Sequence, residues 1–196
     1  MIIWINGAFG SGKTQTAYEL HRRLPQSFIY DPENIGYFIQ KNIPKEIKKS
    51  DFQDYPIWRE INYTVLSHIA HVYNGTIIVP MTIVDPIKFA EIVGKLENEG
   101  IEVKHFALCA TKETLLKRLQ SRGEGKKSWA AEQIDRCIAG LSLEVFQHHI
   151  DTNSMTTQEV ISYLASRAEL ELLPDKRSKF RKSYDRIITQ MKHIRF

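Results

Sequence analysis

Residues 1–14 read MIIWINGAFGSGKT, and this opening decides the fold of the chain. Residues 2–5 form a short apolar run, which is typical of a buried parallel strand. Residues 7–14 match the phosphate-binding pattern G-x-x-x-x-G-K-[ST] at every fixed position. A strand that leads into a glycine-rich turn and then a helix is the context in which this pattern holds a polyphosphate. The opening therefore predicts an α/β nucleotide-binding domain.

Each part of this loop has a chemical task. Its three glycines allow backbone angles that turn successive N–H groups toward an anion, and the following helix directs its positive dipole end at the same point. We expect Lys13 to reach the β and γ phosphates of ATP and the Thr14 hydroxyl to ligate Mg²⁺. A chance glycine-rich turn is disfavoured because loop, strand and helix agree. The predicted ATP site comprises Gly7, Ala8, Phe9, Gly10, Ser11, Gly12, Lys13 and Thr14.

Composition limits the class of protein. The chain has 196 residues, of which 42% are apolar and 26% charged, as expected for one globular domain with a sizeable core. Residues 1–174 carry 19 Lys or Arg against 21 Asp or Glu, whereas residues 175–196 carry 8 against 2. A slightly acidic body with a basic tail argues against a nucleic-acid partner and for a separate role of the C-terminus.

Cysteine usage and apolar patterning indicate a cytoplasmic protein. Cys109 and Cys137 show neither a disulfide framework nor metal-ligand spacing. The chain enters its first strand without a signal peptide, and its longest apolar run is far shorter than the roughly 20 residues of a membrane span. We therefore expect no segment that crosses a bilayer.

Short apolar runs alternate with helical periodicity along the rest of the chain. Further strands are expected at residues 27–30, 76–80, 103–109 and 148–152. This alternation predicts a five-stranded parallel sheet in a three-layer α/β fold, the phosphate-loop fold of small-molecule and nucleoside kinases. We expect residues 1–174 to form this domain and residues 175–196 to form a basic amphipathic helix.

Asp31 follows the second expected strand. Ligands of parallel α/β sheets gather outside the carboxyl ends of the strands, so Asp31 is a candidate catalytic base or Mg²⁺ ligand. Its alternative role is to begin a turn before Pro32. Residues 80–82 follow the third strand where many phosphate-loop enzymes carry a metal-binding Asp, so the second metal contact is expected from Asp31, Asp85 or water. Thr82 is a candidate substrate contact.

Residues 31–73 form the expected acceptor insert, which is rich in aromatic rings and lysines. Rings suit a flat or partly apolar acceptor, and an arginine beside a ring can clamp an anionic group. Core packing of a helical insert explains the rings equally well, and a solvated face explains the lysines. The candidate substrate contacts in this insert are Tyr37, Tyr55, Trp58 and Arg59.

Residues 118–130 form the expected lid. Arg118 and Arg122 lie one helical turn apart, a charged glycine-containing loop follows, and Ser128 caps a further helix that contains Arg136. Arginines above a transferring phosphoryl group stabilise its oxygens while loop closure excludes water. The alternative is a solvated charged helix. We expect all three arginines to contact ATP, and Arg118 and Arg122 to act in catalysis with Lys13 and Asp31.

Residues 175–196 combine apolar residues at helical spacing with eight cations. Such a helix either lies on an anionic membrane, where each cation contributes on the order of 1 kcal/mol, or docks its apolar stripe on the body. Both arrangements stay open at this point, as do a monomer and a homodimer. The apolar residues are Phe180, Tyr184, Ile187, Ile188, Met191 and Ile194.

The chain resembles the bacterial tunicamycin-resistance ATP-binding proteins. The resemblance is carried by residues 2–17, 31–33, 51–59, 79–84 and 112–137, of which 52–59 and 128–131 are the most particular stretches. It implies a protein that uses ATP to protect a bacterium from a lipid-bearing uridine nucleoside antibiotic. It also implies that Gly12 and Lys13 lie in the ATP site and that the basic C-terminal helix contacts the membrane.

We therefore expect a kinase that moves the γ-phosphoryl group of Mg·ATP to a hydroxyl of tunicamycin or a related nucleoside, with Asp31 as base. It would be cytoplasmic, with peripheral contact at the inner face of the cell membrane. Groups aimed at a transition state favour phosphoryl transfer. Two alternatives remain: ATP-dependent sequestration of the drug without chemistry, and a housekeeping nucleoside or small-metabolite kinase.

Overall fold

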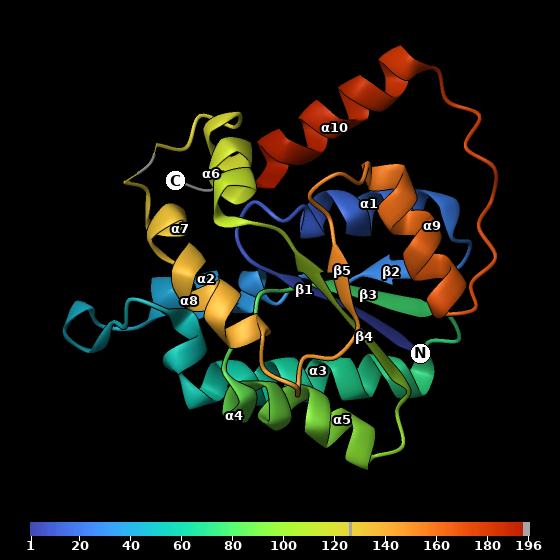
Figure 1. The fold of residues 1–196 in the computed structure, drawn as a ribbon. Helices are drawn as coiled ribbons and strands as arrows, with labels where there is room; N and C mark the ends of the chain where they lie inside the picture. The colour runs from blue at the N-terminus through green and yellow to red at the C-terminus, as the bar shows by residue number, and fades with distance from the viewer. Residues whose placement is uncertain (126, 194–196) are drawn as a thin grey trace.

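The computed structural model describes residues 1–125 and 127–193, and five parallel strands form its sheet (Figure 1). The strands lie in the order β2-β3-β1-β4-β5, and every adjacent pair is parallel. This arrangement confirms the predicted α/β fold with a five-stranded parallel sheet. The strands are β1 (Ile2–Gly7), β2 (Ser27–Ile29), β3 (Thr76–Pro80), β4 (Val103–Cys109) and β5 (His149–Asp151).

Strand β1 lies at the centre of the sheet. Ile2 pairs with Ile77 of β3 on one side and with Val103 of β4 on the other. All six residues of β1 are buried, because the sheet is covered on both faces. The loop that follows β1 therefore leaves from the middle of the carboxyl edge, where ligands of such sheets bind.

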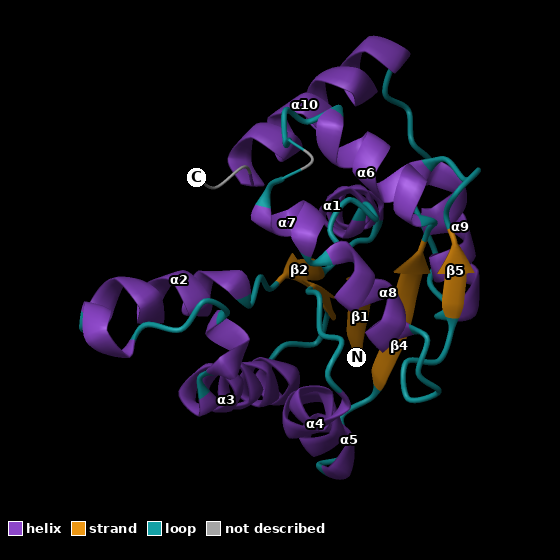
Figure 2. Ribbon diagram, turned by 60° about the vertical axis from the view of Figure 1, so that its left-hand side comes forward, coloured by secondary structure: helices purple, strands orange, loops and turns teal. Residues whose placement is uncertain are grey.

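Helices cover the two faces of the sheet, as Figures 1 and 2 show. Ile3 and Ile5 point to the face covered by α1 (Lys13–Arg23) and α9 (Thr157–Arg167), whereas Ile2 and Trp4 point to the opposite face. Side chains of a strand alternate between faces, so one short apolar run supplies both cores. The helices on the opposite face are α3 (Pro56–Val72), α4 (Pro86–Phe89), α5 (Lys95–Asn98) and α8 (Ile134–Leu141).

Three more helices gather at the carboxyl edge of the sheet. They are α2 (Glu33–Asn42), α6 (Lys112–Gln120) and α7 (Trp129–Glu132). Two of the helices begin at a capping side chain: Asp85 accepts from the amide of Ile87 at 2.8 Å before α4, and Ser128, the cap that the sequence predicts, accepts from Ala131 before α7. These caps satisfy amides that the first helical turn leaves unpaired.

The last helix, α10 (Lys179–His193), packs on α1. It begins four residues later than predicted, because residues 170–178 form an extended connection that runs along the outside of the molecule to the start of α10 (Figure 1). Its polar face is the one that meets the body, since Asp185 and Thr189 are buried while Phe180 is 89% exposed. Of the two arrangements that the sequence left open, docking of the apolar stripe on the body is therefore excluded for Phe180, Tyr184 and Ile187, which are at least half exposed. Ile194, Arg195 and Lys126 lie outside the described residues.

Candidate functional site

The loop between β1 and α1 has the backbone of an anion cradle. Gly7 and Gly12 have φ angles of 148° and 99°, values that residues with a side chain rarely adopt. A Cβ at Gly7 would also lie 2.8 Å from the carbonyl oxygen of Leu108, so this position requires glycine twice over. Gly12 is the N-cap of α1, and the helix presents its free amides and positive dipole end to the loop.

Lys13 closes this loop in the structure. Its ammonium donates to the carbonyl oxygens of Gly7 at 2.9 Å and Ala8 at 3.1 Å, and it lies 5.5 Å from the centre of the Phe9 ring. Burial lowers the pKa of Lys13 to about 8, and the nearby Arg122 lowers it further while Glu33 opposes the shift. Burial disfavours the charged form of Lys13, and a bound anion would stabilise that form.

The loop fits a polyphosphate on a second count. The hydroxyl of Ser11 is buried and has no hydrogen-bond partner in the described part of the chain. Buried hydroxyls are normally paired, so this unpaired hydroxyl within the phosphate loop leaves a donor for a ligand oxygen. Three features of the loop are suited to a triphosphate: glycines with positive φ, a buried ammonium and an unpaired hydroxyl.

Asn6 supports the loop from beneath, a role that the sequence did not indicate. Its carbonyl oxygen accepts from the amides of Gly7 (2.8 Å) and Ile83 (3.0 Å), and its amide donates to the Ile83 carbonyl at 2.7 Å. The same amide group lies 3.2 Å from Nε2 of His105. Burial lowers the pKa of His105 to about 4, so this ring is neutral and accepts the Asn6 proton.

Thr82 is a second support, at the end of β3. Its hydroxyl donates to the Gly7 carbonyl at 2.8 Å, and its own carbonyl accepts from the side chain of Gln53 at 2.9 Å. Thr82 thus connects the phosphate loop to the insert between β2 and β3. It also lines the cavity described next, where the sequence placed it as a substrate contact.

A cavity of about 420 Å³ opens above the loop. The predicted site residues that line it come from the loop, the strand ends, the insert and the lid. Glu33, Asp51, Phe52, Gln53 and Trp129 line it as well and were not predicted. The predicted residues at the cavity are Phe9, Gly10, Gly12, Lys13, Thr14, Asp31, Tyr37, Thr82 and Arg122.

Asp31 begins a turn and also lies at the cavity. Its carboxylate accepts from the amide of Glu33 at 3.0 Å, which starts the turn into α2, and it also lines the cavity. Thr14 lines the same cavity. The described residues contain no group of three His, Cys, Asp or Glu side chains that could hold a metal alone. A Mg²⁺ ion here would use few protein ligands together with phosphate oxygens and waters, which is its usual preference.

Three of the predicted substrate contacts do not line the cavity. Trp58 is fully buried, and its indole donates to the carbonyl of Pro32 at 3.0 Å. Tyr55 is 8% exposed, with its hydroxyl accepting from the amide of Lys49. Arg59 pairs with Glu91 and donates to the carbonyl of Gln53. All three side chains stabilise the insert. The rings of Tyr55 and Trp58 pack in the core, which is the alternative that the sequence left open.

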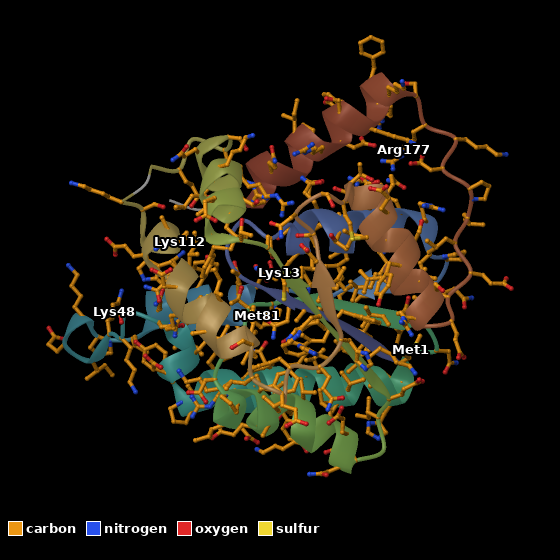
Figure 3. The ribbon with its side chains drawn as sticks, in the orientation of Figure 1. Met1, Lys13, Lys48, Met81, Lys112 and Arg177 are labelled. Carbon is orange, nitrogen blue, oxygen red and sulfur yellow. The ribbon has the colours of Figure 1, made fainter. Side chains whose placement is uncertain are left out.

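The lysines of the insert are solvated. Figure 3 shows Lys48 at the far tip of the insert, well away from Lys13 and Met81 at the centre of the molecule. Lys41, Lys45 and Lys49 are exposed in the same segment. They are therefore a solvated face, the alternative that the sequence left open.

The lid brings one of its three arginines to the cavity. Arg122 lines it, and burial holds the pKa of this guanidinium below its ordinary value. Arg118 instead donates to the carbonyl of Thr152 at 2.6 Å and to its hydroxyl at 3.1 Å, which ties α6 to the end of β5. Arg136 pairs with Asp51 at 3.3 Å and so joins α8 to the insert.

Two aromatic rings join the lid to the phosphate loop. Trp129 lies edge-on to Phe9 with ring centroids 5.1 Å apart, and Trp129 is 47% exposed at the mouth of the cavity. The position of Trp129 directly after the cap Ser128 was visible in the sequence, but nothing there pointed to its partner across the fold. The tail also reaches the cavity, since Thr189 and Gln190 line it.

No helix in the described ranges has the length and apolar character that a bilayer crossing would need. This agrees with the sequence, in which no long apolar run occurs.

Comparisons with known proteins place the chain in a family. The profile of the AAA domain family matches residues 2–143. No curated protein sequence matches the chain. Among solved structures, the tunicamycin resistance protein of Deinococcus radiodurans is 36% identical with a TM-score of 0.77, and the match covers 89% of this chain and 98% of that chain.

Two kinases share the fold at lower identity. A sugar kinase from Janibacter sp. is 16% identical with a TM-score of 0.62, and the match covers 86% of this chain and 94% of that chain. Shikimate kinase from Bacteroides thetaiotaomicron is 16% identical with a TM-score of 0.58, covering 87% and 99%. These two likenesses show the kinase-like fold alone. With an AAA domain over most of its length and a 36% identical relative that it covers almost completely, the chain belongs to the tunicamycin resistance proteins of the AAA domain family.

Proposed function

We propose that the protein is an ATP-dependent phosphotransferase that acts on a hydroxyl of tunicamycin or a related nucleoside. One observation carries the proposal: a single cavity holds the phosphate-loop Lys13, the lid Arg122 and the carboxylate of Asp31. A donor phosphate, a cation for the transition state and a base for the acceptor are the parts that phosphoryl transfer requires. A protein that only binds the drug would need neither the cation for the transition state nor the base.

The loop and the lid hold the donor. With nucleotide bound, Lys13 would give up its contacts to Gly7 and Ala8 and pair with the β and γ phosphates, and Thr14 would be the residue that holds Mg²⁺. The bound Mg²⁺ supplies neutralisation of the phosphate charge. Arg122 stabilises the negative charge on the three equatorial oxygens of the transferring group. Arg118 and Arg136 support this arrangement by positioning α6 and α8.

The insert holds the acceptor. The acceptor hydroxyl oxygen attacks the γ phosphorus, the bond from that phosphorus to the ADP oxygen breaks, and Asp31 takes the hydroxyl proton. Tyr37, Phe52 and Trp129 line the cavity and offer ring faces to the base of a nucleoside. Thr82 lies between this region and the loop, so it is placed to contact either substrate.

Product analysis tests the proposal. Purified protein, Mg·ATP and tunicamycin are incubated together, and the drug is weighed by mass spectrometry. We expect drug that has gained one phosphoryl group. Asp31→Asn should reduce the rate by about a hundredfold or more, the usual contribution of a general base. Asp135→Asn is the matched control, because Asp135 lies on the outside of α8 and pairs with Lys112.

Unmodified drug that stays bound in the presence of ATP would overturn the transfer mechanism and favour sequestration. Phosphorylation of other nucleosides at higher rates than tunicamycin would favour a housekeeping kinase.

We further infer a cytoplasmic location with peripheral contact at an anionic membrane surface. The outward face of α10 exposes Phe180, Tyr184 and Ile187, which lie three or four residues apart on one side of the helix. Exposed cations, among them Lys176 and Lys179, lie beside or just before this stripe. Rings and aliphatic groups bordered by cations are typical of helices that rest on anionic lipid.

A further inference from the structure

Helix α10 is attached to α1 at the part of α1 that carries the phosphate site. The side chain of Gln15, next to Thr14, donates to the backbone carbonyl of Arg186 at 2.8 Å. One helical turn further along α10, the hydroxyl of Thr189 accepts from Arg22 at 3.3 Å. Two positions of α1 thus hold the middle of α10 by polar contacts.

A cluster of charges around Arg177 secures the other end of α10. Arg177 donates to Asp175 at 2.9 Å, to Asp185 at 2.8 Å and to Glu19 of α1. The hydrogen bonds from Arg177 hold the pKa of Asp175 and of Asp185 below its ordinary value. Glu19 is only 6% exposed, and its carboxylate pairs with Arg177 and with Arg22 of its own helix. Figure 3 shows Arg177 at the point where the extended connection enters α10.

The far end of α10 forms part of the cavity. Thr189 and Gln190 line it together with Lys13, Thr14 and Gln15 of the phosphate loop and α1. In Figure 1, α10 runs across α1 toward α6, the helix that carries Arg118 and ends two residues before Arg122. The C-terminal helix is therefore a wall of the site, although it is more than 160 residues away from the loop in sequence.

Arg186 adds positive charge to the same region. The pKa values of Arg118 and Arg122 are lowered first by burial, and in both cases the charge of Arg186 lowers them further. The guanidinium groups of Arg118, Arg122 and Arg186 are therefore near enough to repel one another, and Arg122 among them lines the cavity. A polyanion placed among them would replace this repulsion by attraction.

We propose that α10 completes the nucleotide cavity, that it brings Arg186 to the triphosphate, and that nucleotide binding and docking of α10 stabilise each other. This inference rests on the proposed nucleotide binding and adds a partner for it within the chain. Thermodynamic linkage makes the effect reciprocal: a triphosphate that binds better when α10 is docked must hold α10 more firmly in place.

Two measurements on the full-length chain test the inference. The first is the Kd for Mg·ATP by calorimetry. The second is the rate of chymotrypsin cleavage after Phe180 and Tyr184, which requires α10 to open locally and is quantified by mass spectrometry. For the wild type, Mg·ATP should slow this cleavage at least fivefold. Inorganic tripolyphosphate should protect as well, because Arg186 is expected to recognise phosphates rather than the base.

Two variants separate the docking of α10 by Arg177 from the contact of Arg186 with the ligand. Arg177→Ala should speed cleavage without ligand and weaken ATP binding about tenfold. Arg186→Ala alters an exposed side chain and so leaves folding intact; it should weaken ATP binding by a similar factor but leave unliganded cleavage unchanged. Arg167→Ala is the control for loss of a cation, since Arg167 contacts Tyr163 on α9 and should alter neither measurement.

Each contrary result has a distinct meaning. ATP binding by the wild type with no change in cleavage, or an unchanged Kd in Arg186→Ala and Arg177→Ala, would overturn the inference and leave the proposed function standing. Tighter ATP binding in Arg177→Ala would overturn it too, because α10 would then obstruct the cavity. A wild type that binds no nucleotide would overturn the proposed function and this inference together.

Discussion

Lys13 shows how the molecule keeps a charged side chain ready for a ligand. Its ammonium is buried over its own loop, held by the carbonyls of Gly7 and Ala8, and its pKa is lowered to about 8 chiefly by that burial. A triphosphate would favour the charged form and raise this pKa again. Binding of ATP and uptake of a proton by Lys13 are therefore linked.

This linkage predicts a pH dependence for ATP binding. Below pH 8 Lys13 is already charged in the free protein, so its contribution is constant. Above pH 8 binding must recharge it, and affinity should fall by up to tenfold, about 1.4 kcal/mol, per pH unit until the pKa of the complex is reached. Calorimetric Kd values between pH 7.5 and 9.5 measure the slope. Lys13→Met should bind weakly at every pH and lose the slope; an equal slope in both proteins would contradict the assignment.

The sequence predicted the residues of the phosphate loop but not the side chains that support it. Gly7, Gly12 and Lys13 belong to a pattern whose spacing follows from phosphate chemistry, so they could be located without a structure. Asn6 and Gln53 act through partners 77 and 29 residues away, Ile83 and Thr82. Contacts over such separations depend on the packing of the strands, and no local pattern records them.

Arg118 in α6 and Arg122 just after it have different roles in the lid. Arg118 holds the end of β5 through Thr152, whereas Arg122, one turn later, enters the cavity. The sequence predicted both arginines on one helix and in catalysis, but α6 ends at Gln120, so Arg122 lies in the turn that follows it. Their side chains diverge because Thr152, at the end of β5, offers Arg118 a carbonyl and a hydroxyl within reach.

This division predicts different effects for the two arginines. Arg118→Ala should lower the free energy of unfolding by about 1–2 kcal/mol, because it leaves the Thr152 carbonyl without its charged donor. Arg122→Ala should leave stability almost unchanged and lower kcat for phosphoryl transfer on the order of a hundredfold or more. Urea unfolding and steady-state kinetics on both variants measure the contrast. An equal loss of kcat in both would restore Arg118 to the catalytic groups.

The aromatic residues of the insert between β2 and β3 have two roles that the sequence alone does not distinguish. Its rings divide between the cavity, where Tyr37 and Phe52 lie, and the core, where Trp58 is fully buried. Phe52 contacts both Tyr37 and Trp58, at centroid distances of 5.9 and 5.4 Å, so a single cluster serves packing and site together. Residue type could not separate these roles, because a ring suits both environments.

The whole molecule places its C-terminal helix with the polar face inward. The sequence correctly indicated an amphipathic helix with a basic bias, but the inward side is the one that carries Asp185 and Thr189. Glu19 on α1 favours this orientation, since the buried carboxylate, already paired with Arg22, gains Arg177 as a second partner. The apolar stripe is left facing outward, where it is available to a surface.

Vesicle binding tests this outward face. The full chain should co-sediment with vesicles that contain anionic lipid, and Phe180→Ser with Ile187→Ser should reduce the bound fraction severalfold, because both side chains are at least half exposed on α10. Val72→Ser, which changes a 66% exposed residue on α3, is the control. Equal binding of the double variant, or equal binding to neutral vesicles, would remove the membrane from the proposal.

The contact between Trp129 and Phe9 gives the molecule an optical reporter. The chain has three tryptophans, and Trp4 and Trp58 are both fully buried in the core. Trp129 alone among them stands at the mouth of the cavity, against a ring of the phosphate loop. Its accessibility to a collisional quencher therefore follows the lid without any attached dye, and the other two indoles supply a constant background within the same spectrum.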